Sequence, residues 1–172
     1  MLPFIALALA LSAAPAPAAA APPPACSGPE YRQLDFWVGD WDGAFALPGG
    51  GSGHATNRIT KDEFGSCVIA EHFQTATGPG ASFSTWDPFR KQWVQTWVDA
   101  SGGYITLAGG AVAGQPYRFE LRTLEPRGPK QIQFRMIWED VKPDSFTWRW
   151  QARQADGSYA DNWVIHYTRR KA

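Results

Sequence analysis

The stretch DFWVGDW, which runs from Asp35 to Trp41, decides the fold of this chain. It joins a short apolar turn to a Gly-x-Trp step formed by Gly39 and Trp41. About ten strand-like segments follow it, and no helical periodicity is found after Gly39. This order predicts an all-β fold, a closed, tryptophan-rich, antiparallel barrel of the up-and-down kind. The apolar turn is expected to plug one end of the barrel.

The segment before this stretch predicts a short helix. Residues 27–30 read Ser-Gly-Pro-Glu, a capping-box pattern with proline in the first turn. Tyr31, Leu34 and Trp37 fall on one face, and Gly39 is a natural stop. We expect a helix of about two turns whose apolar face is turned into the barrel.

Short alternating or aromatic-rich runs recur after Gly39, separated by glycine, proline and aspartate turns. The candidate strands are Trp41–Leu47, Thr56–Asp62, Cys67–Thr75, Ser82–Asp87, Gln92–Asp99, Tyr104–Gly109, Tyr117–Leu124, Gln131–Glu139, Ser145–Arg153 and Asn162–Arg170. Closure of these strands into a barrel removes the edges that they would otherwise expose. A β-sandwich is the alternative architecture. A cone-shaped α+β fold is a third, but it would require long N-terminal helices.

The first residues have the pattern of a secretory signal peptide. An apolar run from Leu2 to Ala14 is too short to span a bilayer, and small residues follow it. We therefore expect residues 1–20 to be a signal peptide, 21–26 a linker and 27–172 a single barrel domain. This organisation predicts an exported protein, periplasmic or extracellular. An uncleaved membrane anchor is the alternative.

The chain has two cysteines, Cys26 and Cys67. In an oxidising compartment such a pair tends to form a disulfide. It would close a loop of about 40 residues and stabilise the fold by about 4 kcal/mol in the chain-entropy model. The bridge would fasten the N-terminal segment to the barrel. Two unrelated thiols are the alternative.

Charge and histidine content narrow the range of partners. Sixteen basic and sixteen acidic residues give a formal net charge of zero, and there is no basic run. The sequence therefore gives no reason to expect nucleic acid as a partner or membrane insertion of the mature chain. His54, His72 and His166 do not have the spacing of zinc ligands, so no metal site is predicted. We expect a monomer or a weak dimer.

The Gly39-Asp40-Trp41 step resembles the signature that opens the first strand of lipocalin-like and other calycin barrels. In those barrels a basic residue on the last strand stacks on the tryptophan. The resemblance implies this structural role for Trp41 together with Arg169 or Arg170. Such a contact contributes about 0.5–2 kcal/mol.

A longer pattern is similar to a family of uncharacterised secreted bacterial domains, a domain of unknown function with a DFWVGDW-type motif. The matching stretches are residues 35–41, 65–71, 93–99 and 167–169. The resemblance covers most of the chain after the signal peptide. It implies a calycin-like β-barrel and no established activity.

Residue parity places aromatic and polar side chains together on the inner faces of the strands. Trp93, Gln95 and Trp97 share one face, and Glu71 lies on another with apolar neighbours. The residues that we predict to bind a ligand are Glu71, Trp93, Gln95, Trp97 and Trp148. The aromatic members could equally be core packing. A buried polar group needs a partner, which could be structural or a ligand.

These observations predict an exported barrel that binds a small apolar or amphipathic molecule. One alternative is an isomerase or hydrolase that uses Glu71 as a general base, and no other catalytic residue is proposed. A second is a haem protein, because His166 lies late in the chain and resembles the haem ligand of the barrels called nitrobindins. Its parity, however, points it away from the inner face. A solidly packed structural module is the third, and no cofactor is predicted.

Overall fold

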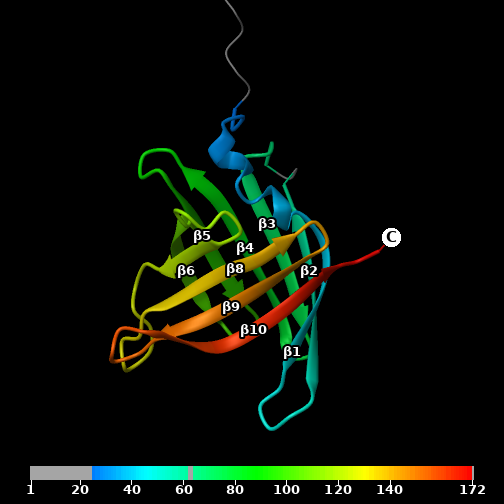
Figure 1. Ribbon diagram of the computed structural model, residues 1–172, viewed down its shortest axis with the longest axis vertical. Coiled ribbons are helices and arrows are strands. Elements are labelled where there is room, and N and C mark those ends of the chain that lie inside the picture. The colour runs from blue at the N-terminus through cyan, green and yellow to red at the C-terminus, as the bar shows by residue number, and fades with distance from the viewer. Residues whose placement is uncertain (1–24, 62–63, 172) are drawn as a thin grey trace, which may run out of the picture.

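The computed structural model describes residues 25–61 and 64–171, so the predicted signal peptide and residues 21–24 of the linker lie outside it. The described chain forms two 3-10 turns and ten strands (Figure 1). Their bounds are η1 Pro29–Arg32, η2 Asp35–Trp37, β1 Gly39–Ala46, β2 Ser52–Thr60, β3 Val68–Thr75, β4 Gly78–Asp87, β5 Gln92–Asp99, β6 Tyr104–Ala111, β7 Phe119–Thr123, β8 Phe134–Lys142, β9 Ser145–Arg153 and β10 Tyr159–Arg169.

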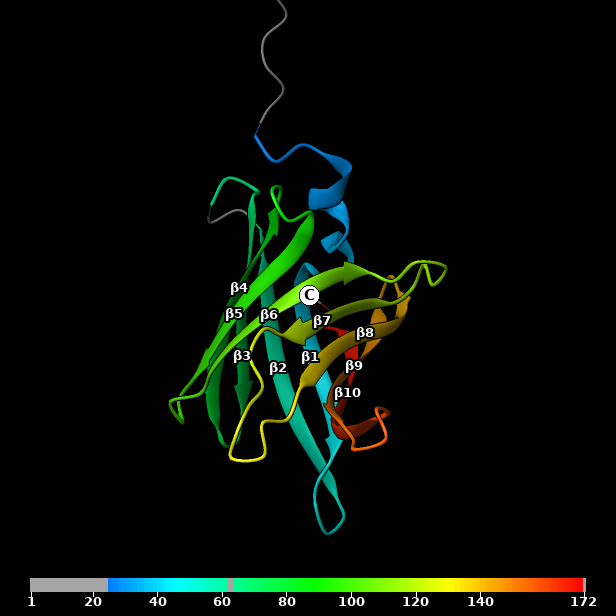
Figure 2. The same cartoon turned by 90° about the vertical axis from the view of Figure 1, so that its left-hand side faces the viewer.

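The ten strands form one closed antiparallel barrel, which confirms the predicted fold. Each strand pairs with its neighbours in sequence, and β1 also pairs with β10, so that no edge is left unpaired. The 3-10 turns sit at one end of the barrel and the β1–β2 hairpin extends from the other (Figures 1 and 2). We call these the plugged end and the open end.

The predicted short N-terminal helix is present as two separate 3-10 turns. The predicted capping box does not form, because the N-cap of the first turn is Gly28, without a capping side chain. The spacing of the apolar residues explains the 3-10 geometry. Tyr31, Leu34 and Trp37 are three residues apart, which matches the three residues per turn of a 3-10 helix better than the 3.6 of an α-helix. Leu34 and Trp37 are both fully buried inside the barrel.

Covalent and ionic contacts hold this segment against the barrel. Cys26 and Cys67 form a disulfide, as predicted, with their Cα atoms 5.2 Å apart. At the end of β2, the Lys61 ammonium donates to the Tyr31 carbonyl oxygen at 2.6 Å and pairs with Asp35. The N-terminal segment is therefore attached to the barrel just after the end of β2, at Lys61, and just before the start of β3, at Cys67. Within the described residues, no helix is long and apolar enough to cross a membrane.

The Gly-x-Trp step forms the closure between the first and last strands. The Arg169 guanidinium carbon lies 4.1 Å from the centroid of the Trp41 ring, and Arg169 Nη1 donates to the Val38 carbonyl oxygen at 3.1 Å. Gly39 has φ +140°, and a Cβ there would lie 2.2 Å from Arg169 Nη1. Only glycine leaves room for the guanidinium at this point. Arg170, the other candidate, pairs with Asp42 on the outer face.

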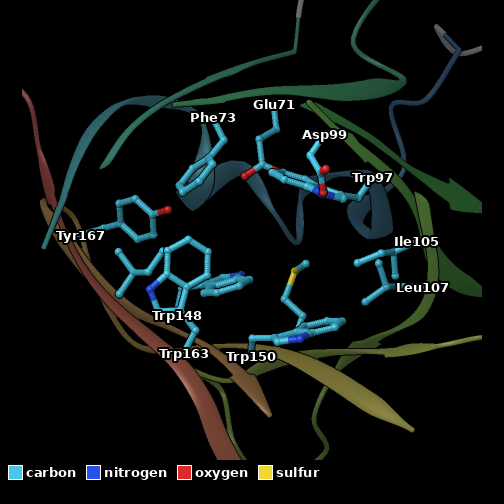
Figure 3. A pocket seen from close by; sticks show the side chains of 12 residues that line it. Glu71, Phe73, Trp97, Asp99, Ile105, Leu107, Trp148, Trp150, Trp163 and Tyr167 are labelled. Atoms are coloured by element: carbon cyan, nitrogen blue, oxygen red, sulfur yellow. The ribbon is translucent and has the colours of Figure 1, made fainter. Parts of the chain in front are cut away.

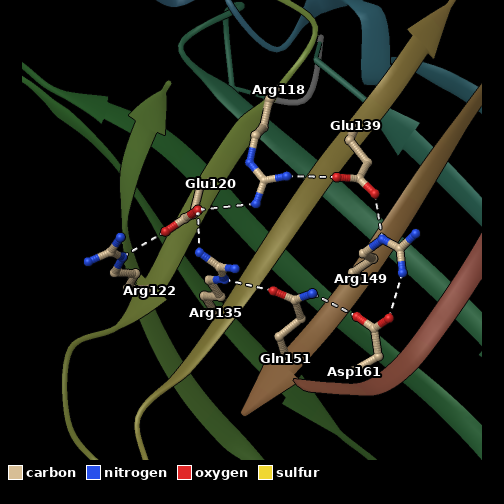
Figure 4. Close-up of polar contacts among 8 residues, drawn as sticks. All are labelled: Arg118, Glu120, Arg122, Arg135, Glu139, Arg149, Gln151 and Asp161. Carbon is tan, nitrogen blue, oxygen red and sulfur yellow. Dashed lines mark hydrogen bonds and ion pairs between the residues drawn. The ribbon is translucent and has the colours of Figure 1, made fainter. Parts of the chain in front are cut away.

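The outer face of β7–β10 carries a continuous network of charged and amide side chains (Figure 4). Its members are Arg118, Glu120, Arg122, Arg135, Glu139, Arg149, Gln151 and Asp161. Glu139 accepts from Arg118 at 2.7 Å and from Arg149 at 2.5 Å, which links three strands. Beneath the network lies Ile137, which is fully buried although it points outward. The network thus covers this wall and leaves the basic groups facing away from the interior.

The disulfide is expected to be intact in the folded protein and to contribute to its stability. Cys26 and Cys67 should resist alkylation until a reductant is added, after which two labels should be taken up. The double substitution Cys26→Ser/Cys67→Ser should lower the free energy of unfolding by about 4 kcal/mol. Mass spectrometry and urea denaturation measure the two effects. Uptake of two labels without reductant would contradict the assignment.

The Trp41–Arg169 contact predicts coupled losses of stability. Trp41→Ala should lower the free energy of unfolding by about 3–5 kcal/mol, because it leaves a cavity in the core. Arg169→Ala should lower it by about 1–2 kcal/mol, because it removes the stacked cation. A double-mutant cycle in denaturant should show that the two losses are not additive. Arg170→Ala is the matched control, and its loss should add to that of Trp41→Ala. Additive losses for both arginines would exclude the stacking interaction.

Candidate functional site

The open half of the barrel interior is hollow. A cavity of about 180 Å³ lies inside the wall formed by β3, β5, β6, β8, β9 and β10. Its lining residues are Glu71, Phe73, Trp97, Asp99, Ile105, Leu107, Met136, Trp148, Trp150, Trp163, Ile165 and Tyr167 (Figure 3). Side chains therefore do not fill the whole barrel, in contrast to the alternative of a solidly packed module.

Aromatic rings form most of the cavity wall. Phe73 contacts Trp97 and Trp163 edge to face, with ring centroids 5.9 and 5.8 Å apart, and Trp163 contacts Trp148 at 5.8 Å. The ring of Trp97 lies over Gly80 of β4, where a Cβ would be 2.2 Å from its Cζ2 atom. A larger residue at position 80 would push Trp97 out of the wall. The geometry of the cavity thus depends on this glycine.

A buried carboxyl group lies in the polar part of the lining. Glu71 Oε1 accepts a hydrogen bond from Asn57 Nδ2 at 2.7 Å, and Glu71 Oε2 accepts one from Ser82 Oγ at 2.5 Å. All three residues are buried. Burial raises the pKa of Glu71, and the two donors oppose this rise. The two hydrogen bonds therefore fix the position of the carboxyl group, but burial still makes its ionised form unfavourable.

Two further polar groups complete the lining. Burial raises the pKa of Tyr167 well above its usual value, the nearby Glu71 adds to the rise, and a hydrogen bond with Asn57 opposes it. Asp99 lies at the open end of β5, where Ser101 Oγ and Trp97 Nε1 donate to it. These bonds lower the Asp99 pKa to about 2, so that this carboxylate is ionised at neutral pH. Figure 3 shows both carboxyl groups on the side of the cavity opposite Trp148 and Trp150.

The structure brings together three of the five predicted ligand-binding residues. Glu71, Trp97 and Trp148 line the cavity, but Trp93 and Gln95 do not. Trp93 is fully buried near the plug and donates to Gln33 Oε1 at 3.2 Å. Gln95 Nε2 donates to Ser84 Oγ at 3.0 Å, so its amide nitrogen has a structural partner. Residues 93 and 97 share a face but are about 13 Å apart along the strand, and only the second reaches the cavity.

Three polar groups around Glu71 were not among the predicted site residues. Asn57 and Ser82 donate to Glu71 from β2 and β4, and Tyr167 of β10 lies near it in the cavity lining. Their alternating parity indicated that they face inward, but only the strand register shows that they meet. In the register, Ser82 is directly opposite Glu71 and Asn57 is two residues from the partner of Glu71, Ile59.

The histidine that suggested haem lies outside the cavity. His166 is exposed on the outer face of β10, where its Nδ1 atom is 3.3 Å from Thr147 Oγ1. It is not a lining residue. Among the described residues, no group of three or more histidine, cysteine or acidic side chains could hold a metal ion. The lining can therefore contribute apolar contact, hydrogen bonds and negative charge.

The comparisons with known proteins identify a family and a fold. A family model described as "Protein of unknown function (DUF1579)" matches residues 27–169. The structure is similar to the crystal structure of Rv2717c from M. tuberculosis, with a TM-score of 0.54 at 13% sequence identity. That match covers 84% of this chain and 99% of the other, and at this identity it shows the fold alone. No curated protein matches the sequence significantly.

The raised pKa of Glu71 predicts a pH-dependent contribution to stability. Between the unfolded value of 4.5 and the higher folded value, the folded state retains a proton that the unfolded state has lost. The contribution is therefore fully present below the unfolded pKa and is lost as pH rises through the folded pKa. Glu71→Gln cannot titrate, so the wild type should lose stability relative to this variant as pH rises from about 4.5, by up to about 1.4 kcal/mol per pH unit.

Urea denaturation of both proteins at several pH values measures this difference. Glu125→Gln, which removes an exposed carboxyl group from the β7–β8 connection, is the matched control for the loss of one negative charge. A stability difference between wild type and Glu71→Gln that does not change with pH would show that burial does not raise the Glu71 pKa.

Proposed function

The chain belongs to the DUF1579 family of proteins of unknown function, and we propose that it is an exported binding protein that holds one small amphipathic molecule at the open end of the barrel. The cavity carries this proposal. It combines an apolar, aromatic wall with a few fixed polar groups, which is the usual composition of a small-molecule site.

The size of the cavity limits the ligand. Its volume of about 180 Å³ is close to the volume of an apolar protein cavity that binds benzene. A ligand of about one ring or one short branched chain would fill it. This is smaller than the usual range of about 300–1,000 Å³ for drug-sized ligands.

The arrangement of polar groups gives the ligand an orientation. Glu71 and Tyr167 lie deeper in the barrel than Asp99, which is at the rim. Ser82 and Asn57 fix the Glu71 carboxyl group from the neighbouring strands. A polar head directed toward Glu71 would leave the apolar body against Trp148, Trp150 and Trp163. Packing and hydrogen bonding would then act on different parts of one molecule.

Two observations support a location outside the cytoplasm. The Cys26–Cys67 disulfide is typical of proteins in oxidising compartments. The apolar run from Leu2 to Ala14, followed by small residues, has the pattern of a secretory signal. Both features favour a periplasmic or extracellular carrier or sensor of a small molecule.

A cavity-filling substitution tests the proposal with a neutral probe, benzyl alcohol. The wild type should bind it saturably with one-to-one stoichiometry, as measured by titration calorimetry and by the change in tryptophan emission. Ile105→Phe places a ring in the cavity and should weaken binding by about tenfold or more. Val98→Phe makes a similar change on the outer face of β5, where Val98 is 48% exposed, and should leave binding unchanged.

Equal affinities of the wild type and both variants would place the probe outside the cavity. Absence of binding by the wild type to benzyl alcohol and to other one-ring or short branched probes would contradict the proposed function.

A further inference from the structure

The cavity contains negative charge without positive charge. Two acidic side chains, Glu71 and Asp99, line it, and none of the lining residues that the structure describes is lysine, arginine or histidine. Arg122, Arg135 and Arg149 of β7–β9 lie in the outer network, and Arg169 lies at the plugged end. The interior is therefore electrostatically complementary to a cation.

The aromatic wall favours the same kind of ligand. Trp97, Trp148, Trp150 and Trp163 surround the space with indole rings, the side chains whose faces attract cations most strongly. These four rings are only partly buried, because part of their surface faces the cavity. In contrast, the fully buried tryptophans lie at the plugged end of the barrel. They are Trp37, Trp41, Trp93 and Trp138. The four partly buried indole rings and the two carboxyl groups border one space.

We propose that the ligand of this cavity is a small organic ammonium ion, held between the tryptophan rings with its charge toward Glu71. This inference rests on the proposed function and names the chemical class of its ligand. The methyl or methylene groups around an ammonium nitrogen would contact the rings, and the positive charge would complement the carboxylates.

The hydrogen-bond donors to Glu71 are neutral. Its oxygens accept hydrogen bonds from neutral donors on β2 and β4, Asn57 and Ser82. A buried carboxylate that has only neutral donors remains costly, and a cation within the same cavity would reduce that cost. Ammonium binding should therefore favour the ionised carboxylate and release a proton at pH values where the empty cavity holds one.

The titratable groups near Glu71 have pKa values shifted in different directions. Tyr167 on β10 stays neutral because its pKa is raised, and Asp99 on β5 stays ionised because its pKa is about 2. His72, the next residue on β3, is exposed on the outer face, and its charge lowers the Glu71 pKa. A pH titration of ligand binding therefore reports Glu71, and His72→Asn serves as the control for the neighbouring imidazole.

The test compares two probes of one shape on the full mature chain. Choline carries a trimethylammonium group, and neohexanol carries a tert-butyl group in its place, so the two differ in charge and hardly in size. At about pH 8, titration calorimetry should give choline an affinity at least about tenfold higher than that of neohexanol, or about 1.4 kcal/mol. As pH falls below the folded pKa of Glu71, only choline should bind more weakly, in the wild type and in His72→Asn alike.

Glu71→Gln should weaken choline binding by about tenfold or more and change neohexanol binding by less than about threefold. Neohexanol binding also shows that the variant is folded with its cavity intact. The wild-type ratio and its pH dependence require no variant and stand if Glu71→Gln does not fold. Equal or tighter binding of neohexanol at about pH 8 would overturn the ammonium assignment and leave the proposed function standing. Failure of both probes to bind would overturn the assignment, and failure of benzyl alcohol as well would overturn the proposed function.

Discussion

The guanidinium of Arg169 lies over the Trp41 indole where the first strand meets the last, and this contact determines how the barrel closes. Trp41 in turn donates to the Trp37 carbonyl oxygen at 2.8 Å, so the 3-10 turns and the closing strands share one packing unit. Trp138 packs against Trp37 with ring centroids 5.1 Å apart, and Trp93 is fully buried at the same end of the barrel. Because the plug uses the inner space at one end only, the opposite end remains hollow.

The barrel therefore uses one residue type in two ways. Four tryptophans are fully buried at the plugged end. Four others, nearer the open end, line the cavity and are only partly buried. Parity within a strand cannot separate the two groups, because every second residue faces inward at any depth. The sequence thus predicted the inner faces of β3, β5 and β9 but included Trp93 and Gln95 in the site. Their depth follows from strand tilt and from the position of the plug, which a single sequence does not reveal.

The closed barrel, the disulfide and the position of most strands could be predicted, since glycine and proline turns and aromatic alternation are local signals. The short helix at the plugged end was predicted, but its division into two 3-10 turns was not, because a spacing of three suits more than one kind of helix. The polar partners of Glu71 were missed for a different reason. Asn57 and Ser82 are 14 and 11 residues away, and they meet the carboxyl group only through the pairing register of β2, β3 and β4.

The most direct test of this account is an NMR titration that follows the indole N–H signals of the nine tryptophans in the presence of benzyl alcohol or choline. The account predicts saturable shifts for Trp97, Trp148, Trp150 and Trp163, which line the cavity. The signals of the tryptophans that are buried at the plugged end should hardly move. These are Trp37, Trp41, Trp93 and Trp138. Shifts confined to the plug, or no shift of the four cavity tryptophans with either probe at saturating concentration, would contradict it.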